Sequence, residues 1–380
     1  MIWLQFYVNS ICFFRNVIIL EYHDKDMLLD DIIKVRTRST AELTADELAG
    51  LFHALSDSIT IKRYVSEHRP RGGGMIFGFV PMFLLYVLME CRRQTYRGMT
   101  KNLTIEEAFV LGFPIKDDMI RIPAASTLNS FVNHILIPNV MQPLSKEFGE
   151  CFISMSEEKG ILTIDSTPVE ACHGDKDAEF NPHYRINMKK AHIAMRNGMP
   201  LCMEYSGGND GDNPYARPLL ESCKGMGAGR KNISMFMADG SYDAFETFGD
   251  VWETIGVQSR MRLHSNHVLS EDACPEEIDR VVNRNWKHGG SKDMPMAKKL
   301  TFLCSIDKKE LAGMYLRNLC ITDPLRDIRL KDRWECEVTH SSMKQWIDFT
   351  VRGTRIKTRE STVRCKFLCV QVLCALFIPA

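Results

Sequence analysis

Two apolar stretches that each reach an aspartate place the strongest constraint on how this chain folds. The stretch ILTIDSTPVEA (161–171) contains Asp165, and ISMFMAD (233–239) ends on Asp239. Between them, residues 189–205 predict a hairpin around an Asn-Gly turn, and a helix follows. Strands separated by helices need crossover connections and therefore pair partly in parallel. The sequence thus predicts an α/β fold with a mixed central sheet flanked by helices.

The pattern continues after the second aspartate with a helix and a third apolar strand, VQSRMR (257–262). The helix before the second stretch is predicted to begin with Asn213 as its N-cap, because a proline follows at the first helical position. Residues 263–330 contain charged loops, with predicted strands in KKLTFLCSI (298–306) and AGMYLRNLCI (312–321). We expect this segment to be an insertion in the α/β domain.

The N-terminal region is predicted to be helical. Capping-box sequences, in which glutamate follows threonine by three residues, mark helix starts at Thr44 and Thr104. We therefore expect an all-α domain over residues 27–150, with binding of DNA ends as one role for it. The leader over residues 1–26 lacks the basic segment and cleavage site of a signal peptide. We interpret it as translated upstream sequence before a native start at Met27, with a poor membrane segment as the alternative.

The charge balance excludes a protein that is drawn to nucleic acid by its total charge. Lysine plus arginine and aspartate plus glutamate number 48 each, so any basic surface is local. The glycine-rich stretch 62–74 and the tail 351–366 are two such segments, each with a solvated loop as the alternative to phosphate binding. The thirteen cysteines include no Cys-x-x-Cys pair, which favours reduced thiols in a cytosol. The apolar stretch 75–89 is short for a membrane span and predicts a core helix.

Asp165 and Asp239 occupy equivalent places, because each closes a predicted apolar strand and each is followed by small residues. If the two strands are parallel neighbours, both carboxylates leave the same edge of the sheet, where ligands of open α/β sheets gather. Two adjacent carboxylates repel each other unless a cation lies between them, and Mg²⁺ prefers such oxygen ligands. The alternative is that each aspartate only caps the following helix or forms a local turn.

A third ligand is expected on a late helix, DRWECEVTHSSMKQWIDF (332–349). Helical spacing puts one carboxylate and three basic side chains on one face, namely Glu337, Arg333, His340 and Lys344. The opposite side is apolar and contains Trp334, Val338, Trp346 and Phe349. A salt-bridged solvent face is the alternative interpretation of the charged stripe. A carboxylate flanked by cations nevertheless suits a metal ion beside a phosphodiester.

Together these motifs resemble the DDE transposases of prokaryotic insertion sequences, in the insertion-sequence-4-like group. That family carries a tyrosine, arginine, glutamate and lysine signature with two, three and six residues between successive members. Arg333, Glu337 and Lys344 match this spacing, and Leu330 stands at the tyrosine position. IDSTPVEA resembles the family's first-aspartate motif, and MADGSYDAFETF resembles its second.

The resemblance implies an RNase H-like core over residues 151–380, preceded by the all-α domain. Asp165, Asp239 and Glu337 would be the catalytic residues and would hold two Mg²⁺ ions, for which Mn²⁺ can substitute. The reaction would be DNA cleavage at element ends followed by strand transfer, through in-line displacement at phosphorus. An RNase H-like metal-dependent nuclease and a catalytically decayed DNA-binding remnant are the alternatives.

The resemblance also implies how DNA is held. Arg333 and Lys344 would hold phosphates beside the cut, and His340 faces the same way, with a plain surface histidine as the alternative. The tail separately predicts a phosphate-binding strip that includes Arg352, Arg355, Lys357 and Arg359. The expected partners are double-stranded DNA, as terminal inverted repeats and as target, and a second copy of the chain in a homodimer on DNA. We expect a cytoplasmic, nucleoid-associated protein without a membrane partner.

Overall fold

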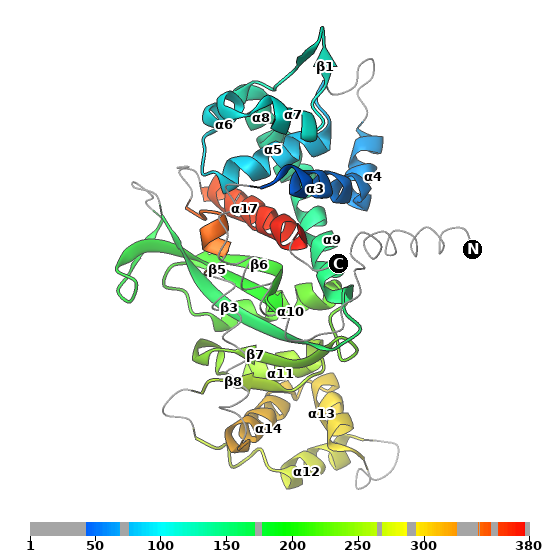
Figure 1. Ribbon diagram of the computed structural model, residues 1–380. Helices are drawn as coiled ribbons and strands as arrows, with labels where there is room; N and C mark the ends of the chain where they lie inside the picture. Colours follow the sequence, from blue (N-terminus) through cyan, green and yellow to red (C-terminus); the bar gives the residue numbers. More distant parts are fainter. Residues whose placement is uncertain are drawn as a thin grey trace, which may run out of the picture. The chain divides into compact units, whose positions relative to one another are not determined.

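The computed structural model describes residues 43–68, 76–171, 177–263, 268–286, 294–324, 341, 343–350 and 356–376 (Figure 1). The chain divides into two compact units. The helical unit consists of Met1–Phe148 and Ser341–Ala380, and the sheet unit consists of Gly149–His340. The described residues from 341 onward are grouped with the N-terminal helices, and the predicted domain over 151–380 stays a prediction.

Short helices and one small hairpin build the helical unit. In chain order its elements are α3 (Ala45–Asp57), α4 (Ile59–Glu67), α5 (Phe79–Cys91), α6 (Tyr96–Asn102), α7 (Ile105–Val110), β1 (Ile115–Lys116), β2 (Met119–Ile120), α8 (Ala125–Phe131), η2 (Val132–Val140), the start of α9 (Met141–Ser154), and α17 (Ile356–Leu376). Both predicted capping boxes are confirmed, because Thr44 and Thr104 each accept a hydrogen bond from the amide of the glutamate three residues on. These caps satisfy N–H groups that the first helical turn leaves without partners.

Helix α5 forms the centre of the helical unit, as expected for a core helix. Every residue of α5 except Glu90 is buried. The C-terminal helix α17 packs against α3, α5 and η2, and Figure 1 shows its red ribbon beside the blue and cyan helices. Gln371 of α17 is fully buried and shares a hydrogen bond of 2.6 Å with Ser145 of α9. Among the described helices, none combines the length and the apolar content needed to cross a membrane.

A mixed sheet forms the core of the sheet unit. In chain order its elements are β3 (Gly160–Glu170), β4 (Glu179–Asn181), β5 (Ile186–Arg196), β6 (Met199–Gly207), α10 (Asn213–Gly225), β7 (Ile233–Ala238), η3 (Gly240–Tyr242), α11 (Phe245–Thr254), β8 (Ser259–Met261), α12 (Pro275–Asn285), α13 (Met296–Ser305) and α14 (Lys309–Thr322). The strands run in the order β4-β5-β3-β7-β8, and β6 also pairs with β5. An antiparallel β3–β5–β6 meander continues into parallel β7 and β8. This arrangement confirms the predicted α/β class and the RNase H-like core.

The predicted hairpin joins β5 to β6. Asn197 and Gly198 at its tip have φ values of 49° and 76°, as a two-residue type I′ turn requires. Next to the tip of the hairpin, the buried Arg196 donates hydrogen bonds to the carbonyls of Phe152 and Glu158, at 3.2 and 2.6 Å. The hairpin thereby anchors the segment that leads into β3.

The predicted insertion over residues 263–330 contains helices α12, α13 and α14 in its described part, which corrects two predictions. The stretches 298–306 and 312–321 were expected as strands, but they lie mainly in α13 and α14. Their buried residues fall at helical spacing, for example Ala312, Leu316 and Cys320. Helix α14 packs closely on α11, and the absence of a side chain at Gly313 permits this contact. A Cβ atom at that position would overlap the carbonyl oxygen of Phe245. The apolar residues favoured strands, but packing against a neighbouring helix decided the outcome.

Candidate active site at the ends of two parallel strands

The two predicted aspartates lie side by side at the end of the parallel pairing between β3 and β7. Ile164 and Ala238 are the last paired residues, so Asp165 and Asp239 are the next residue on each strand. Neighbouring strands lie about 4.8 Å apart, and paired residues of parallel strands direct their side chains to the same face. Both aspartates are half-buried, while Ile164 and Ala238 beneath them are fully buried. The structure therefore brings these two carboxylates together.

The first strand does not stop at its aspartate, which corrects a further prediction. Strand β3 continues to Glu170, and its antiparallel pairing with β5 runs from Leu162 to that residue. Only the parallel partner ends, because β7 stops at Ala238. Asp165 therefore lies on a strand that is held on one side beyond the site, so its backbone is rigid where the carboxylate leaves the sheet.

Each carboxylate is oriented by a serine that follows it. The Oδ1 atom of Asp165 accepts a hydrogen bond of 2.9 Å from the amide of Ser166. The Oδ1 atom of Asp239 accepts one of 3.0 Å from the amide of Ser241 and another from the Ser241 hydroxyl. Asp239 is also the N-cap of η3, so the capping alternative is partly correct for it. Capping through one carboxylate oxygen is compatible with metal binding, since a carboxylate has two oxygens.

A third carboxylate, Asp212, lies close to this pair and was not singled out as a site residue from the sequence. The pKa values of Tyr242 and Tyr184 both respond to the charges of Asp212, Asp165 and Asp239. Burial raises the pKa of Tyr242 well above its usual value, and the charges of Asp212, Asp165 and Asp239 raise it further. The pKa of Tyr184 is also raised, first by burial and then by the same three carboxylates. Both phenol groups therefore lie within the electrostatic reach of all three aspartates.

Asp212 is buried and surrounded by polar partners. Its Oδ1 accepts a hydrogen bond of 2.9 Å from Lys190 Nζ, and its Oδ2 accepts one of 3.0 Å from the Ser166 hydroxyl. Burial by itself raises the pKa of this carboxyl, but hydrogen bonds from Lys190 and Ser241 lower it below its usual value overall. Asp212 is therefore an anion in the folded protein at neutral pH, although only 8% of its surface is exposed.

His192 lies beside Asp212 in the interior and is neutral. Its ring is fully buried and stacks on Tyr215 at a centroid distance of 4.2 Å. Its Nε2 lies 2.8 Å from the Ser206 hydroxyl, and its Nδ1 lies 3.3 Å from the Tyr242 hydroxyl. Burial is the main cause that lowers its pKa to about 4. An imidazole that stays neutral at pH 7 has a packing and hydrogen-bonding role here.

The predicted third ligand and most predicted DNA contacts lie outside the described residues. These residues are Glu337, Arg333, His340, Arg352 and Arg355, together with Leu330 and the side chain of Lys357. Lys344 is described and belongs to the helical unit, where burial lowers the pKa of its ammonium group. Its carbonyl accepts a hydrogen bond of 3.3 Å from Arg93. Trp346 and Phe349, expected on the apolar side of the late helix, are 6% and 4% exposed.

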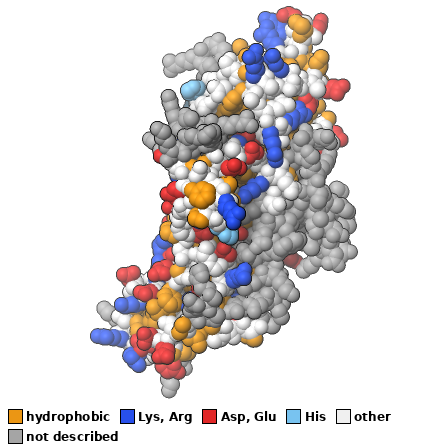
Figure 2. All heavy atoms as spheres, turned by 90° about the vertical axis from the view of Figure 1, so that its left-hand side faces the viewer, with side chains coloured by type: hydrophobic (Ala, Val, Ile, Leu, Met, Phe, Trp, Pro, Cys, Tyr) orange, Lys and Arg blue, Asp and Glu red, His pale blue; other side chains and the backbone are white. Residues whose placement is uncertain are grey.

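The structure does not support Arg359 as part of an exposed phosphate-binding strip. Its residue surface is only 5% exposed, in the buried part of α17. Two further cations of the same tail are paired, since Arg364 bonds to Glu360 at 2.9 Å and Lys366 lies 3.3 Å from Glu90. The packing of α17 buries Arg359 and Lys366, which a count of charges along the sequence does not detect. On the face shown in Figure 2, the described basic and acidic side chains are interspersed, in line with the neutral total charge.

The strand-end carboxylates fit part of a divalent metal site. Hard cations such as Mg²⁺ prefer oxygen donors, and Asp165 and Asp239 supply them at the end of the β3–β7 pairing. Within the part of the chain that the structure describes, no three His, Cys, Asp or Glu side chains are grouped to hold a metal ion. Glu337, which the resemblance implies as the third ligand, lies beyond that part.

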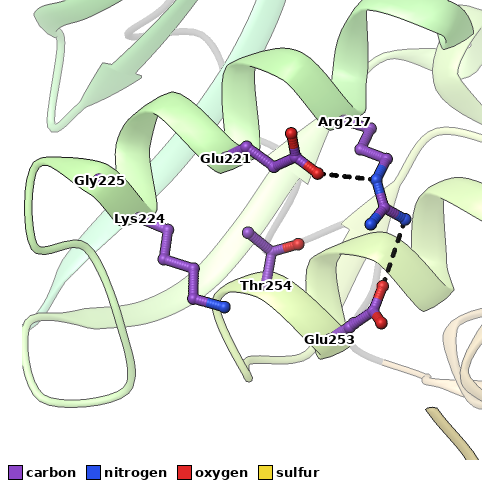
Figure 3. A pocket seen from close by; sticks show the side chains of 6 residues that line it. All are labelled: Arg217, Glu221, Lys224, Gly225, Glu253 and Thr254. Carbon is purple, nitrogen blue, oxygen red and sulfur yellow. Dashed lines mark hydrogen bonds and ion pairs between the residues drawn. The ribbon is translucent and has the colours of Figure 1, made fainter. Parts of the chain in front are cut away.

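A shallow hollow elsewhere on the sheet unit does not share these features (Figure 3). Its volume is about 360 Å³, and its lining residues are Arg217, Glu221, Lys224, Gly225, Glu253 and Thr254. Arg217 points into ion pairs with Glu221 and Glu253, at 2.8 and 3.3 Å. Lys224 and Gly225 end helix α10, whereas Asp212 precedes its first residue, and a helix of this length spans about 20 Å. None of Asp165, Asp212 and Asp239 lines this hollow.

Comparison with known proteins agrees with the geometry of the strand ends. A family model described as the transposase DDE domain matches residues 156–365, which is more than half of the chain. The matched region includes both strand-end aspartates and Glu337. No curated protein matches the chain in sequence. On the family match, supported by the paired aspartates of the mixed sheet, the chain belongs to the DDE transposases.

Proposed function

We propose that this chain cleaves DNA at the ends of a mobile element and joins the freed ends to target DNA. The observation that carries the proposal is the adjacency of Asp165 and Asp239 where the parallel pairing of β3 and β7 ends, inside the matched transposase domain. Two carboxylates at such an edge are suited to phosphoryl transfer, which needs charge and positioning more than covalent chemistry. Membership of the insertion-sequence-4-like group stays a prediction.

Asp165, Asp239 and Glu337 are proposed to hold divalent ions, with Mg²⁺ as the natural cofactor and Mn²⁺ as a substitute. Ions bound there supply activation of a water or 3′-hydroxyl nucleophile and stabilisation of the leaving oxygen. The contribution of the chain is geometric, because the Ile164–Ala238 pairing sets the spacing of the two strand-end carboxylates. The amides of the following serines orient one oxygen of each carboxylate.

DNA is proposed to contact the basic residues of the late helix and the tail. Arg333 and Lys344 would hold phosphates near the cut, and His340 would add a contact on the same side. The remaining candidates are Arg352, Arg355 and Lys357. Arg359 is not included, because it is buried. Such contacts place the DNA without reading its sequence, so their loss should weaken binding to all DNA in a salt-dependent way.

We further propose that two copies assemble on DNA, one for each element end, and that the protein acts in the cytoplasm at the nucleoid. The helical unit is the candidate for recognition of the element ends, because the strand-end aspartates lie in the sheet unit. These proposals rest on the family, whose reaction joins two ends to one target.

The proposed reaction can be tested with a plasmid that carries the flanking DNA of the gene. Purified protein is incubated with Mg²⁺, Mn²⁺ or a chelator, and nicked and joined products are mapped by sequencing. Asp165→Asn, Asp239→Asn and Glu337→Gln each remove one proposed ligand charge. Asp250→Asn is the control, because Asp250 is also a carboxylate of the sheet unit but is more deeply buried and pairs with Arg217 and Lys309. We expect metal-dependent cuts at the repeat ends that the three ligand variants lose and the control retains.

The products also discriminate between the alternatives. Cleavage without joined products would favour an RNase H-like nuclease. DNA binding without cleavage, by the unaltered chain as well as by the variants, would favour a decayed remnant. Unchanged cleavage in Asp165→Asn and Asp239→Asn would refute the assignment of the strand-end site.

A further inference from the structure

Asp212 occupies the N-cap position of α10 but does not cap the helix. The sequence predicts Asn213 as the cap, whereas the structure places the cap one residue earlier, at Asp212. An aspartate at this position usually accepts a hydrogen bond from an amide of the first turn. The side chain of Asp212 makes no such bond. It turns toward the sheet instead, and an ordinary capping role therefore does not account for a buried carboxylate.

The Asp212 carboxylate approaches the site from behind the first strand. Successive side chains of a strand point to opposite faces, so Asp165 and Ser166 lie on opposite faces of β3. Asp212 accepts the hydrogen bond from the Ser166 hydroxyl at 3.0 Å, on the face that α10 covers. It therefore touches the residue that follows the first strand-end aspartate without sharing the face of that aspartate.

The same carboxylate also interacts with the second strand end. The hydroxyl of Ser241, which bonds to Asp239, also lies near enough to the carboxyl of Asp212 to lower its pKa. Ser166 and Ser241 are the residues whose amides orient Asp165 and Asp239. One buried carboxylate thus lies next to both serines that hold the strand-end pair.

Strand β5 keeps Asp212 in this place. Lys190 and His192 are two residues apart on β5 and therefore project from the same face. Lys190 supplies the charged hydrogen bond of 2.9 Å and also bonds to the carbonyl of Asp210 at 2.8 Å. His192 Nδ1 lies 3.8 Å from the Asp212 carboxylate, and its ring is fixed by stacking on Tyr215. The ammonium group balances the buried negative charge, which would otherwise be costly.

We propose that Asp212 is a positioning residue of the strand-end site, holding Ser166 and lying beside Ser241, so that Asp165 and Asp239 present their carboxylates together. Lys190 and His192 support it from β5. This inference deepens the proposed function and rests on it. Groups that orient metal ligands typically contribute about 10- to 100-fold to metal affinity or activity. Because Asp212 is paired with Lys190 and lies behind β3, it acts through the serines and is not itself a ligand.

Binding of Mn²⁺ to the full chain, measured by electron paramagnetic resonance, tests the proposal without requiring turnover. Asp212→Ala should weaken Mn²⁺ binding about 10- to 100-fold. Asp212→Asn, which keeps an oxygen acceptor for Ser166, should recover part of this loss. Asp250→Ala is the control, because Asp250 is 6% exposed and is also paired with a lysine, yet its partners lie on helices. The control should bind Mn²⁺ as the unaltered chain does.

In the cleavage assay, Asp212→Ala should lower kcat by a similar factor and leave KM for DNA unchanged. Equal behaviour of Asp212→Ala and Asp250→Ala in both assays would overturn the proposal. Complete loss of Mn²⁺ binding in Asp212→Asn, as in Asp165→Asn, would also overturn it, because Asp212 would then be a ligand. If Asp212→Ala does not fold, Ser166→Ala removes the same hydrogen bond by deleting one hydroxyl and should weaken Mn²⁺ binding.

Failure of the proposed function can be distinguished from failure of this inference. If the unaltered chain binds Mn²⁺ but does not cut DNA, the transposition proposal fails, and the binding series still decides the role of Asp212. If the unaltered chain cuts DNA and Asp212→Ala cuts equally well, only the positioning role fails. If the unaltered chain neither binds Mn²⁺ nor cuts DNA, both proposals are refuted.

Discussion

Replacing Arg317 by methionine should destabilise the sheet unit strongly, because it breaks a buried ion pair just after the second strand-end aspartate. Arg317 on α14 donates two hydrogen bonds to the Asp243 carboxylate, at 2.6 and 2.9 Å. The side chains of Asp243 and Arg317 are only 1% and 10% exposed. The arginine also bonds to the Val268 carbonyl at 3.1 Å and lies over the ring of Phe245.

The expected cost follows from this burial. Exposed ion pairs contribute about 0–1 kcal/mol, but removing one partner of a buried pair costs about 3–5 kcal/mol, because the other charge loses its compensation. Solvent does not screen a bidentate pair at these exposures, so the larger range applies. A tenfold change in an equilibrium corresponds to about 1.4 kcal/mol. The opening equilibrium of the packed helices should therefore shift by roughly two to three and a half powers of ten.

Hydrogen exchange measured by mass spectrometry suits this prediction, since it reports on α11 and α14 separately from the helical unit. Amides of these two helices should exchange faster by roughly two to three and a half powers of ten. Arg280→Met is the control, because Arg280 is 76% exposed and pairs with Glu277 at i,i+3 on α12. The control should cost less than about 0.5 kcal/mol. Equal effects of the two substitutions would refute the reasoning that burial decides the worth of these pairs.

Three smaller predictions concern other elements. Gly313→Ala should cost about 1–3 kcal/mol by separating α14 from the Phe245 carbonyl, and a thermal melt that matches the unaltered chain would contradict this. Gly198→Ala should cost about 1–2 kcal/mol, because φ at the hairpin tip is 76°, and denaturant titration measures it. The Arg92 hydrogen bond lowers the pKa of Glu107 below its usual 4.5, so its stabilisation is present above that pH and is lost as the pH falls through the folded value. Glu107→Gln should therefore lower stability at pH 7 and reduce its fall below pH 4.5, which melts across pH would show.

Local sequence signals determined several elements in both units. The capping boxes at Thr44 and Thr104 formed as predicted, because a cap involves only residues of one turn. The Asn197-Gly198 turn formed for the same reason, since its left-handed backbone is a local property. The two apolar stretches and their order also indicated that Asp165 and Asp239 would meet, because crossover connections make the strands parallel.

Residue preferences did not determine the secondary structure of α13 and α14 or the unit that α17 joins, because both depend on partners distant in the sequence. Helices α13 and α14 formed where strands were expected, because their apolar residues pack at helical spacing in the helical layer that includes α11. The C-terminal helix α17 joined the helical unit, since it contacts α3 and α5, and this turned Arg359 inward. A run of basic residues has the same sequence pattern whether its helix packs on a core or faces solvent, so the pattern does not predict which of the two occurs.

The role of Asp212 illustrates what only the tertiary structure decided. In the sequence it is one of several acids in a polar loop, and it would cap the next helix as well as any other. Its partners Lys190 and Ser166 lie 22 and 46 residues away along the chain. They meet because β3 and β5 pair in one register, which fixes the face on which each side chain lies. The sequence alone determined which two apolar stretches bring their aspartates to the site, whereas long-range pairing decided which buried charges surround it.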